Sequence, residues 1–253
     1  MIKFFRKIRQ NLLMENKTGE YLKYAVGEIF LVITGILIAL SINNWNTNKL
    51  DRISEADYLK RLSNDLVSDT LTYNWTYKLI LEKQEALGNV IAHLTNNEND
   101  SMDSISLLYN LRQGMNFTFA HPKPVTSTFE ELKNTGNFIK IENSEMRSII
   151  SKYYFEVEHQ YKRIEQKRIS PNYGDEIDKI IPDLGLNNGE INYRGDLVSY
   201  NEIVDNINNP EFKKLVISEF NLAVFMQPIQ KKGLKESKIL LSQIKDELVK
   251  LQN

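Results

Sequence analysis

A long apolar stretch near the N-terminus constrains the fold of this chain more than any other feature. Residues 29–42 read IFLVITGILIALSI and carry no charge, and the apolar character extends upstream to Tyr24 past one acid, Glu28. Because an α-helix rises about 1.5 Å per residue and the hydrocarbon core of a bilayer is about 30 Å thick, a spanning helix needs about 20 residues. We therefore predict a cytoplasmic segment at residues 1–23, a transmembrane helix at 24–45 and an exported domain at 46–253.

The charges before this stretch predict its orientation. Residues 1–24 contain Lys3, Arg6, Lys7, Arg9, Lys17 and Lys23 against Glu15 and Glu20. Positively charged flanks stay on the cytoplasmic side, so the N-terminus is predicted to be cytoplasmic. The remainder of the chain would then be periplasmic, as in a single-pass protein of the inner membrane.

A cleaved secretory signal peptide is the alternative interpretation of a basic segment followed by an apolar run. Here the run is long, it is followed by SINNWN, and no small-x-small cleavage site comes after it, so the sequence favours an uncleaved signal anchor. The chain has no cysteine, which excludes disulfides and thiolate metal sites and is compatible with export.

The first 13 residues have the pattern of an amphipathic helix. Ile2, Phe5, Ile8 and Leu12 recur at helical spacing between the basic residues. This pattern predicts a helix lying on the anionic inner leaflet. A nucleic-acid partner is not favoured, because the segment is short, tethered to a membrane and without a second basic face.

Small residues fall on one face of the predicted span. Gly27, Gly35 and Ala39 would allow a second helix to approach closely, which predicts self-association or a membrane partner. The alternative is that glycine and alanine are simply common in spans. Glu28 nearby is either a snorkelling acid paired with Lys23 or a partner-binding group.

Trp45 ends the span as an interface anchor, and a helical seam follows it. Steps of three and four residues connect Leu59, Leu62, Leu66, Tyr73, Ile80, Leu87, Val90 and Leu94. Asp69, Thr76 and Lys83 interrupt this coiled-coil-like seam, which favours packing inside a helical bundle over a two-stranded coiled coil. With no strand alternation elsewhere, the predicted fold class is all-α.

The middle of the chain predicts short elements separated by turn residues. After a polar loop at 96–104 comes a helix at 105–112, and Pro122 and Pro124 force an extended connector. Ser127 and Glu130 have the spacing of a capping box for a helix at 128–134 that Gly136 stops.

Further helices are predicted towards the C-terminus. One is capped by Asn143 or Ser144 and ends near residue 167, and an irregular region at 169–198 follows it. Another begins at a Ser199–Glu202 capping box, and the last begins at Pro210 and breaks or kinks near Pro228 and Gly233.

Catalytic and metal-binding patterns are sparse. The three histidines, His93, His121 and His159, are far apart, and Glu156 with His159 forms a single Glu-x-x-His pair where a di-iron bundle needs two such pairs and two further Glu. No glycine-rich phosphate loop, Gly-x-Ser-x-Gly or His-Glu-x-x-His motif occurs. We therefore predict no enzyme, no metal site and no cofactor.

Three exported tripeptides have an acid, a hydroxyl residue and an apolar residue in succession, which resembles a periplasmic O-glycosylation acceptor. They begin at Asp69, Asp100 and Asp103. Thr70 falls on the helical seam, where a sugar would obstruct packing, whereas Ser101 and Ser104 lie in the most polar loop. Chance occurrence of so permissive a pattern is the alternative.

Three stretches resemble a Gram-negative bacterial family of uncharacterised single-pass membrane proteins, classed as a domain of unknown function. They are residues 2–13, residues 24–46 and TFEELKNTGN at 128–137. The resemblance is strongest over residues 1–46 and continues to Lys167, while residues 169–208 match nothing in the family pattern. It implies the topology above and brings no catalytic residues.

These patterns favour a membrane-anchored helical interaction or scaffold protein whose partners are the bilayer and another membrane protein or a second copy. A periplasmic sensor is the alternative. Its cytoplasmic part of about two dozen residues is too short to fold an output domain, so it would have to signal through a separate protein.

Overall fold

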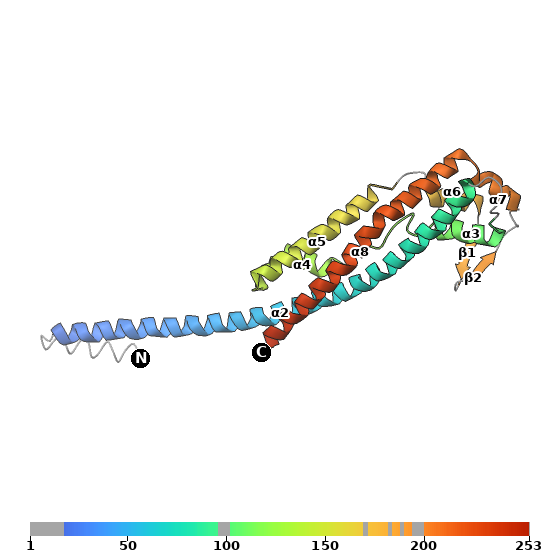
Figure 1. The fold of residues 1–253 in the computed structure, drawn as a ribbon. Coiled ribbons are helices and arrows are strands. Elements are labelled where there is room, and N and C mark those ends of the chain that lie inside the picture. The colour runs from blue at the N-terminus through green and yellow to red at the C-terminus, as the bar shows by residue number, and fades with distance from the viewer. Residues whose placement is uncertain are drawn as a thin grey trace. The chain divides into compact units, whose positions relative to one another are not determined.

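The structure is a computed structural model that describes residues 18–95, 102–168, 172–181, 184–187, 190–193 and 200–252. The chain divides into two compact units, Met1–Glu55 and Ala56–Asn253. Helix α2 (Thr18–Thr95) contributes to both (Figure 1). The amphipathic helix predicted at residues 1–13 lies outside the described residues.

The first unit contains one helix that is long and apolar enough to cross a membrane. Its most apolar window has a mean hydropathy of 2.4, and none of that window is buried against other parts of the chain. Ile29, Phe30, Leu37 and Ile42 each expose more than half of their surface. This distribution excludes a buried core helix, although a signal sequence would have the same composition and position.

In the second unit, the part of α2 that carries the predicted seam is buried as expected. Its eight apolar seam residues are at most 8% exposed. The interrupting residues Asp69, Thr76 and Lys83 are buried too, at 1%, 1% and 0% exposure. The polar interruptions therefore lie inside a helical bundle, and the all-α fold class is confirmed.

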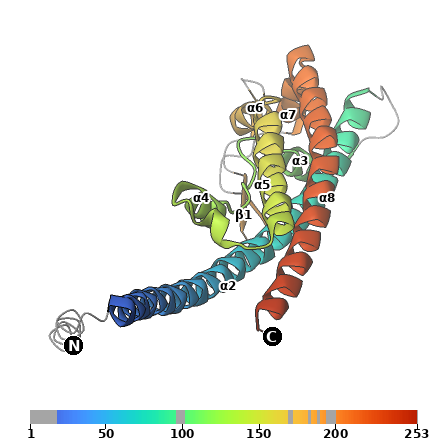
Figure 2. The same ribbon diagram turned by 90° about the vertical axis from the view of Figure 1, so that its left-hand side faces the viewer.

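Six more α-helices and a short 3₁₀-helix accompany α2 among the described residues. They are α3 (Ser104–Gln113), α4 (Ser127–Asn134), η1 (Asn137–Lys140), α5 (Ser144–Glu165), α6 (Tyr173–Ile180), α7 (Tyr200–Ile207) and α8 (Pro210–Gln252). Helices α5 and α8 pack side by side, and α6 and α7 contact α8 (Figure 2).

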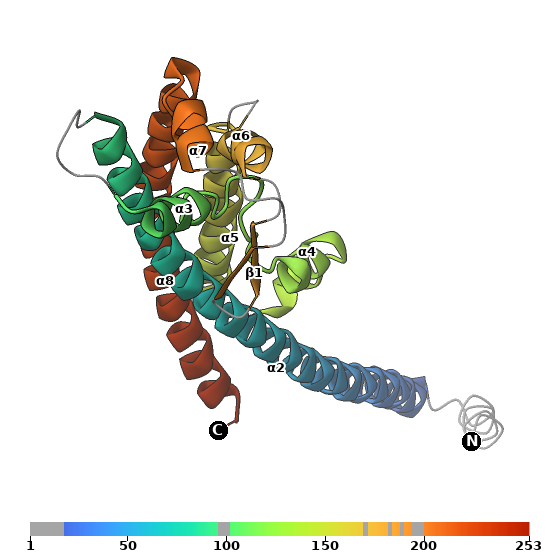
Figure 3. The same cartoon turned by 90° about the vertical axis from the view of Figure 1, so that its right-hand side faces the viewer.

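Three groups of apolar side chains form the core of this unit. One joins the end of α2 to α3, α6, α7 and the start of α8, which gather at one end in Figure 3. A second joins residues 59–66 of α2 to α4, α5 and the end of α8. The third, around Ile80, Ile164 and Met226, lies between them along α2 and α8. The polar seam residues occupy the levels that separate these groups.

Helix starts agree with the sequence only in part. Asn143 caps α5 by accepting hydrogen bonds from the backbone N–H groups of Glu145 and Met146, as predicted. The capping box predicted at Ser127 is wrong, because α4 begins one residue earlier than expected and Thr126 occupies its N-cap without a side-chain hydrogen bond. The stop at Gly136 is confirmed by its left-handed backbone, with φ of 71°.

Two other expectations in the C-terminal half need correction. Helix α8 runs without a break through Pro228 and Gly233, so the predicted break is wrong, while a kink there stays a prediction. Pro228 is exposed, so water can satisfy the backbone carbonyl that the proline leaves without an N–H donor. The region at 169–198, expected to be irregular and free of strands, contains α6 and an antiparallel hairpin of β1 (Leu184–Asn187) and β2 (Glu190–Tyr193). Four-residue strands are too short to show a clear alternation. Ser199 lies outside the described residues.

Candidate functional site: a buried polar cluster

A buried ion pair between α2 and α8 is the centre of the main polar cluster. Lys83 donates a hydrogen bond to Glu219 Oε1, and the two residues are 0% and 5% exposed. Burial lowers the pKa of Lys83, and the carboxylate of Glu219 opposes this shift. The pair joins positions 136 residues apart in the chain.

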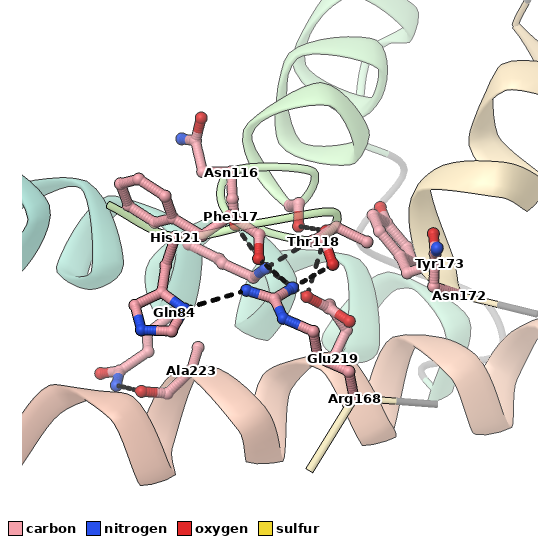
Figure 4. Close-up of polar contacts among 12 residues, drawn as sticks. Gln84, Asn116, Phe117, Thr118, His121, Arg168, Asn172, Tyr173, Glu219 and Ala223 are labelled. Atoms are coloured by element: carbon pink, nitrogen blue, oxygen red, sulfur yellow. Dashed lines mark hydrogen bonds and ion pairs between the residues drawn. The ribbon is translucent and has the colours of Figure 1, made fainter. Parts of the chain in front are cut away.

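The turn after α3 supplies the remaining hydrogen-bond acceptors of the Lys83 ammonium group. Its Nζ donates to the backbone carbonyl of Asn116 at 2.6 Å and to Thr118 Oγ1 at 3.4 Å, and Thr118 donates to Glu219 at 3.1 Å (Figure 4). Lysine has three N–H donors, so these acceptors use all of them. The ammonium group therefore has no free position for a substrate or a ligand.

Arg168, just after α5, fixes the same turn from the other side. It donates to the carbonyl of Phe117 at 2.6 Å and to the carbonyl of Thr118 (Figure 4). Phe117 has φ of 58°, a left-handed conformation that is strained for a residue with a side chain. The guanidinium and an edge-on contact with Trp75 hold this strained residue in place.

His121 is buried where the turn becomes the extended connector. Its Nδ1 lies 3.0 Å from Glu165 Oε1 and 3.4 Å from Arg168 Nη2, and its ring packs on Tyr161. Burial and the charge of Arg168 lower the pKa of His121, while Glu165 opposes the shift. The cluster thus ties α2, α5, α8 and the connector into one network.

A second polar layer lies around Asp69 of α2. Its carboxylate accepts hydrogen bonds from the backbone N–H of Val125 at 2.8 Å and from the hydroxyl of Tyr153 at 3.0 Å. Burial raises the pKa of Asp69 to about 6, against the effect of these two hydrogen bonds. On α8, Gly233 passes so close to the ring of Tyr73 that an added Cβ would clash with it.

These clusters connect the helices of the second unit through buried hydrogen bonds and an ion pair. Within the described residues, the acceptors around Lys83 belong to the protein, and no group of three His, Asp or Glu side chains could hold a metal ion. The sequence showed Asp69 and Lys83 as polar interruptions of an apolar helical seam. It did not show Glu219 or Arg168, because neither residue interrupts a periodic apolar pattern.

The residues that the sequence proposed as sites do not come together. Gly27 and Gly35 have no atom within 4 Å of an added Cβ, and Trp45 is 65% exposed, so both the packing face and the interface anchor remain predictions. Glu28 and Ala39 lie on the same helix and are likewise untested.

The remaining candidates are scattered over the helical unit. Glu156 pairs with Lys232, and His159 stacks on Phe155. Ser104 is the exposed first residue of α3, whose N-cap is Asp103, while Ser101 lies outside the described residues. Glycosylation of either serine remains a prediction.

Comparison with known proteins yields one family match. The model of a family of unknown function, DUF6090, matches residues 28–180, which include most of α2 and all of α3, α4, α5 and α6. No curated protein and no solved structure matches the chain.

Proposed function

This chain belongs to DUF6090, a family whose function is unknown, and we propose that it is a membrane-anchored helical interaction protein. Because the family carries no known function, the support for this proposal is the chain's own sequence and structure. The observation that supports this proposal is the unburied apolar helix of the first unit. So long an exposed apolar surface is unfavourable in water and favourable in a bilayer. Residues 24–45 would anchor the chain, and the helical unit would present surfaces to partners.

Membrane retention tests the anchor. We expect the intact chain to remain in the membrane pellet after an alkaline carbonate wash, and the double variant Ile33→Arg/Leu37→Arg to be released. Each arginine at the centre of a span costs about 2.5–3.5 kcal/mol of insertion free energy. The matched control is Val67→Arg/Leu71→Arg, which places two arginines at exposed positions on the same helix outside the span. Equal retention of both double variants would contradict the proposal.

We further propose that the N-terminus is cytoplasmic and that residues from about 46 onward are periplasmic in a Gram-negative cell, with the span in the inner membrane. The excess of basic residues before the span supports this orientation. Alkaline phosphatase fused after Asn253 is expected to be active. An inactive fusion together with an active cytoplasmic reporter at the same position would reverse the topology.

Self-association through the span is part of the same proposal. A Gly35→Ile variant is expected to lower dimer cross-linking in bilayers, because a large side chain would keep two helices apart. A Cβ added at Gly35 meets no atom of the described residues within 4 Å, so a loss of cross-linking would indicate an intermolecular contact. Ile33→Phe, on the opposite side of the helix, is the control. Equal cross-linking of all three proteins would assign this face to lipid.

The alternative function, a periplasmic sensor that acts through a separate protein, requires a ligand site on the helical unit. An open groove between α2 and α3 is the observation in its favour.

A further inference from the structure

A groove of about 490 Å³ lies on the helical unit between α2 and α3. Glu82 and Glu85 line it from α2, and Ile105 and Tyr109 line it from α3. The two apolar side chains are 71% and 47% exposed. The groove thus combines an acidic wall with an apolar wall.

The floor of the groove is built and internally satisfied. Asn89 donates to Asn110 Oδ1 at 3.2 Å, and Asn110 donates to the carbonyl of Ser106 at 2.8 Å. Asn110 is 8% exposed. The first of these bonds joins α2 to α3, and the second fixes the Asn110 side chain on its own helix, so the two walls are tied together at this level.

The acidic wall is formed by two carboxylates, Glu82 and Glu85. Among the residues that the structure describes, neither Glu82 nor Glu85 forms an ion pair, whereas Glu176, Glu211 and Glu247 each pair with a lysine on their own helix. The two unpaired carboxylates lie three residues apart on α2 and face the same groove. They are complementary to a positively charged partner.

We propose that this groove docks a basic segment of a partner protein, with an apolar side chain against Ile105 and Tyr109 and a lysine or arginine at Glu82 and Glu85. An open groove would leave much of the surface of a drug-sized molecule in contact with water, whereas small-molecule sites bury most of the ligand. A peptide segment can lie along such a groove. This docking site deepens the proposed function, because it states the chemistry of the partner that the anchored unit would bind.

The test uses the full chain in detergent and a fluorescein-labelled amphipathic peptide of leucine and lysine as the probe. We expect binding that weakens with salt, and a Glu82→Gln/Glu85→Gln variant that binds about five- to tenfold more weakly, as for the loss of two exposed charge pairs. The control Glu145→Gln/Asp246→Asn removes the same charge at exposed positions on α5 and α8 and is expected to bind like the wild type. Tyr109→Ala should weaken binding without changing its salt dependence.

Three outcomes would overturn the docking site. They are equal binding by the two double variants, displacement of the peptide by spermidine without any effect of Tyr109→Ala, and a change in self-association of the chain when the groove is mutated. The first shows no charge recognition, the second a small amine as ligand, and the third a second copy as occupant. Since the measurement is made in detergent, its failure would leave membrane retention, the test of the proposed function, unaffected.

Discussion

Replacing Lys83 by methionine is expected to lower the free energy of unfolding of the helical unit by about 3–5 kcal/mol, because it leaves a buried carboxylate without its counter-charge. Glu219 is 5% exposed, so water cannot replace the lost ammonium group. Thr118 and the carbonyl of Asn116 lose a hydrogen-bond donor as well. Denaturant unfolding of the full chain in detergent, followed by circular dichroism, measures the change.

Two further variants separate the effect of charge from that of packing. Lys83→Met/Glu219→Leu removes both charges and is expected to recover most of the lost stability. Lys78→Met changes an exposed lysine on the same helix and is expected to alter the free energy of unfolding by no more than about 0.5 kcal/mol. A Lys83→Met protein as stable as the Lys78→Met protein would show that the buried pair does not hold α2 against α8.

Asp69 is expected to make the helical unit less stable as the pH rises from about 4 to about 7. Its pKa is about 6 in the folded protein against a usual value of 3.8, so the folded state binds its proton more tightly than the unfolded state does. The stabilisation from protonated Asp69 is fully present below the pKa of the unfolded state, and it is lost as the pH rises through the pKa of the folded state. At about 1.4 kcal/mol per pKa unit, the change is about 3 kcal/mol.

The Asp69→Asn variant isolates this contribution. An asparagine side chain can still accept from the N–H of Val125 and contact Tyr153, but it does not titrate. Other carboxylates, such as Glu131 beside Arg61, have lowered pKa values and lose stability in acid, so the quantity to compare is the difference between the two proteins. That difference should shift by about 3 kcal/mol in favour of the variant by pH 7. Asp57→Asn, exposed on the same helix, should track the wild type, and a pH-independent difference for Asp69→Asn would contradict the prediction.

The helical periodicity of the sequence predicted the seam of α2 correctly, because burial of one helix face imposes a spacing that a single segment reveals. Asp69 and Lys83 were recognisable as interruptions for the same reason. Their partners were not, since Val125, Tyr153 and Glu219 meet them only through tertiary packing. The groove was missed because it depends on how two helices approach each other.

Local signals failed where packing overrides them. Ser127 and Glu130 satisfy the spacing of a capping box, yet α4 takes Thr126 as its N-cap. Pro228 would break an isolated helix, but buried side chains before and after it, Met226 and Gln230, hold α8 in the bundle. In contrast, Asn172 and Asp175 form a capping box at the start of α6 that the sequence shows in hindsight.

The family match and the folding unit end at different residues. Helix α8 passes close to Tyr73 and forms the ion pair with Lys83, so it belongs to the folding unit. The match ends at residue 180, whereas the helix that covers α2 begins at residue 210. A fragment cut at the end of the match would retain Lys83 without Glu219 and would uncover the apolar face at Leu59, Leu62 and Leu66. The shortest self-sufficient piece of this protein therefore extends to the end of α8, well past the part that the family model describes.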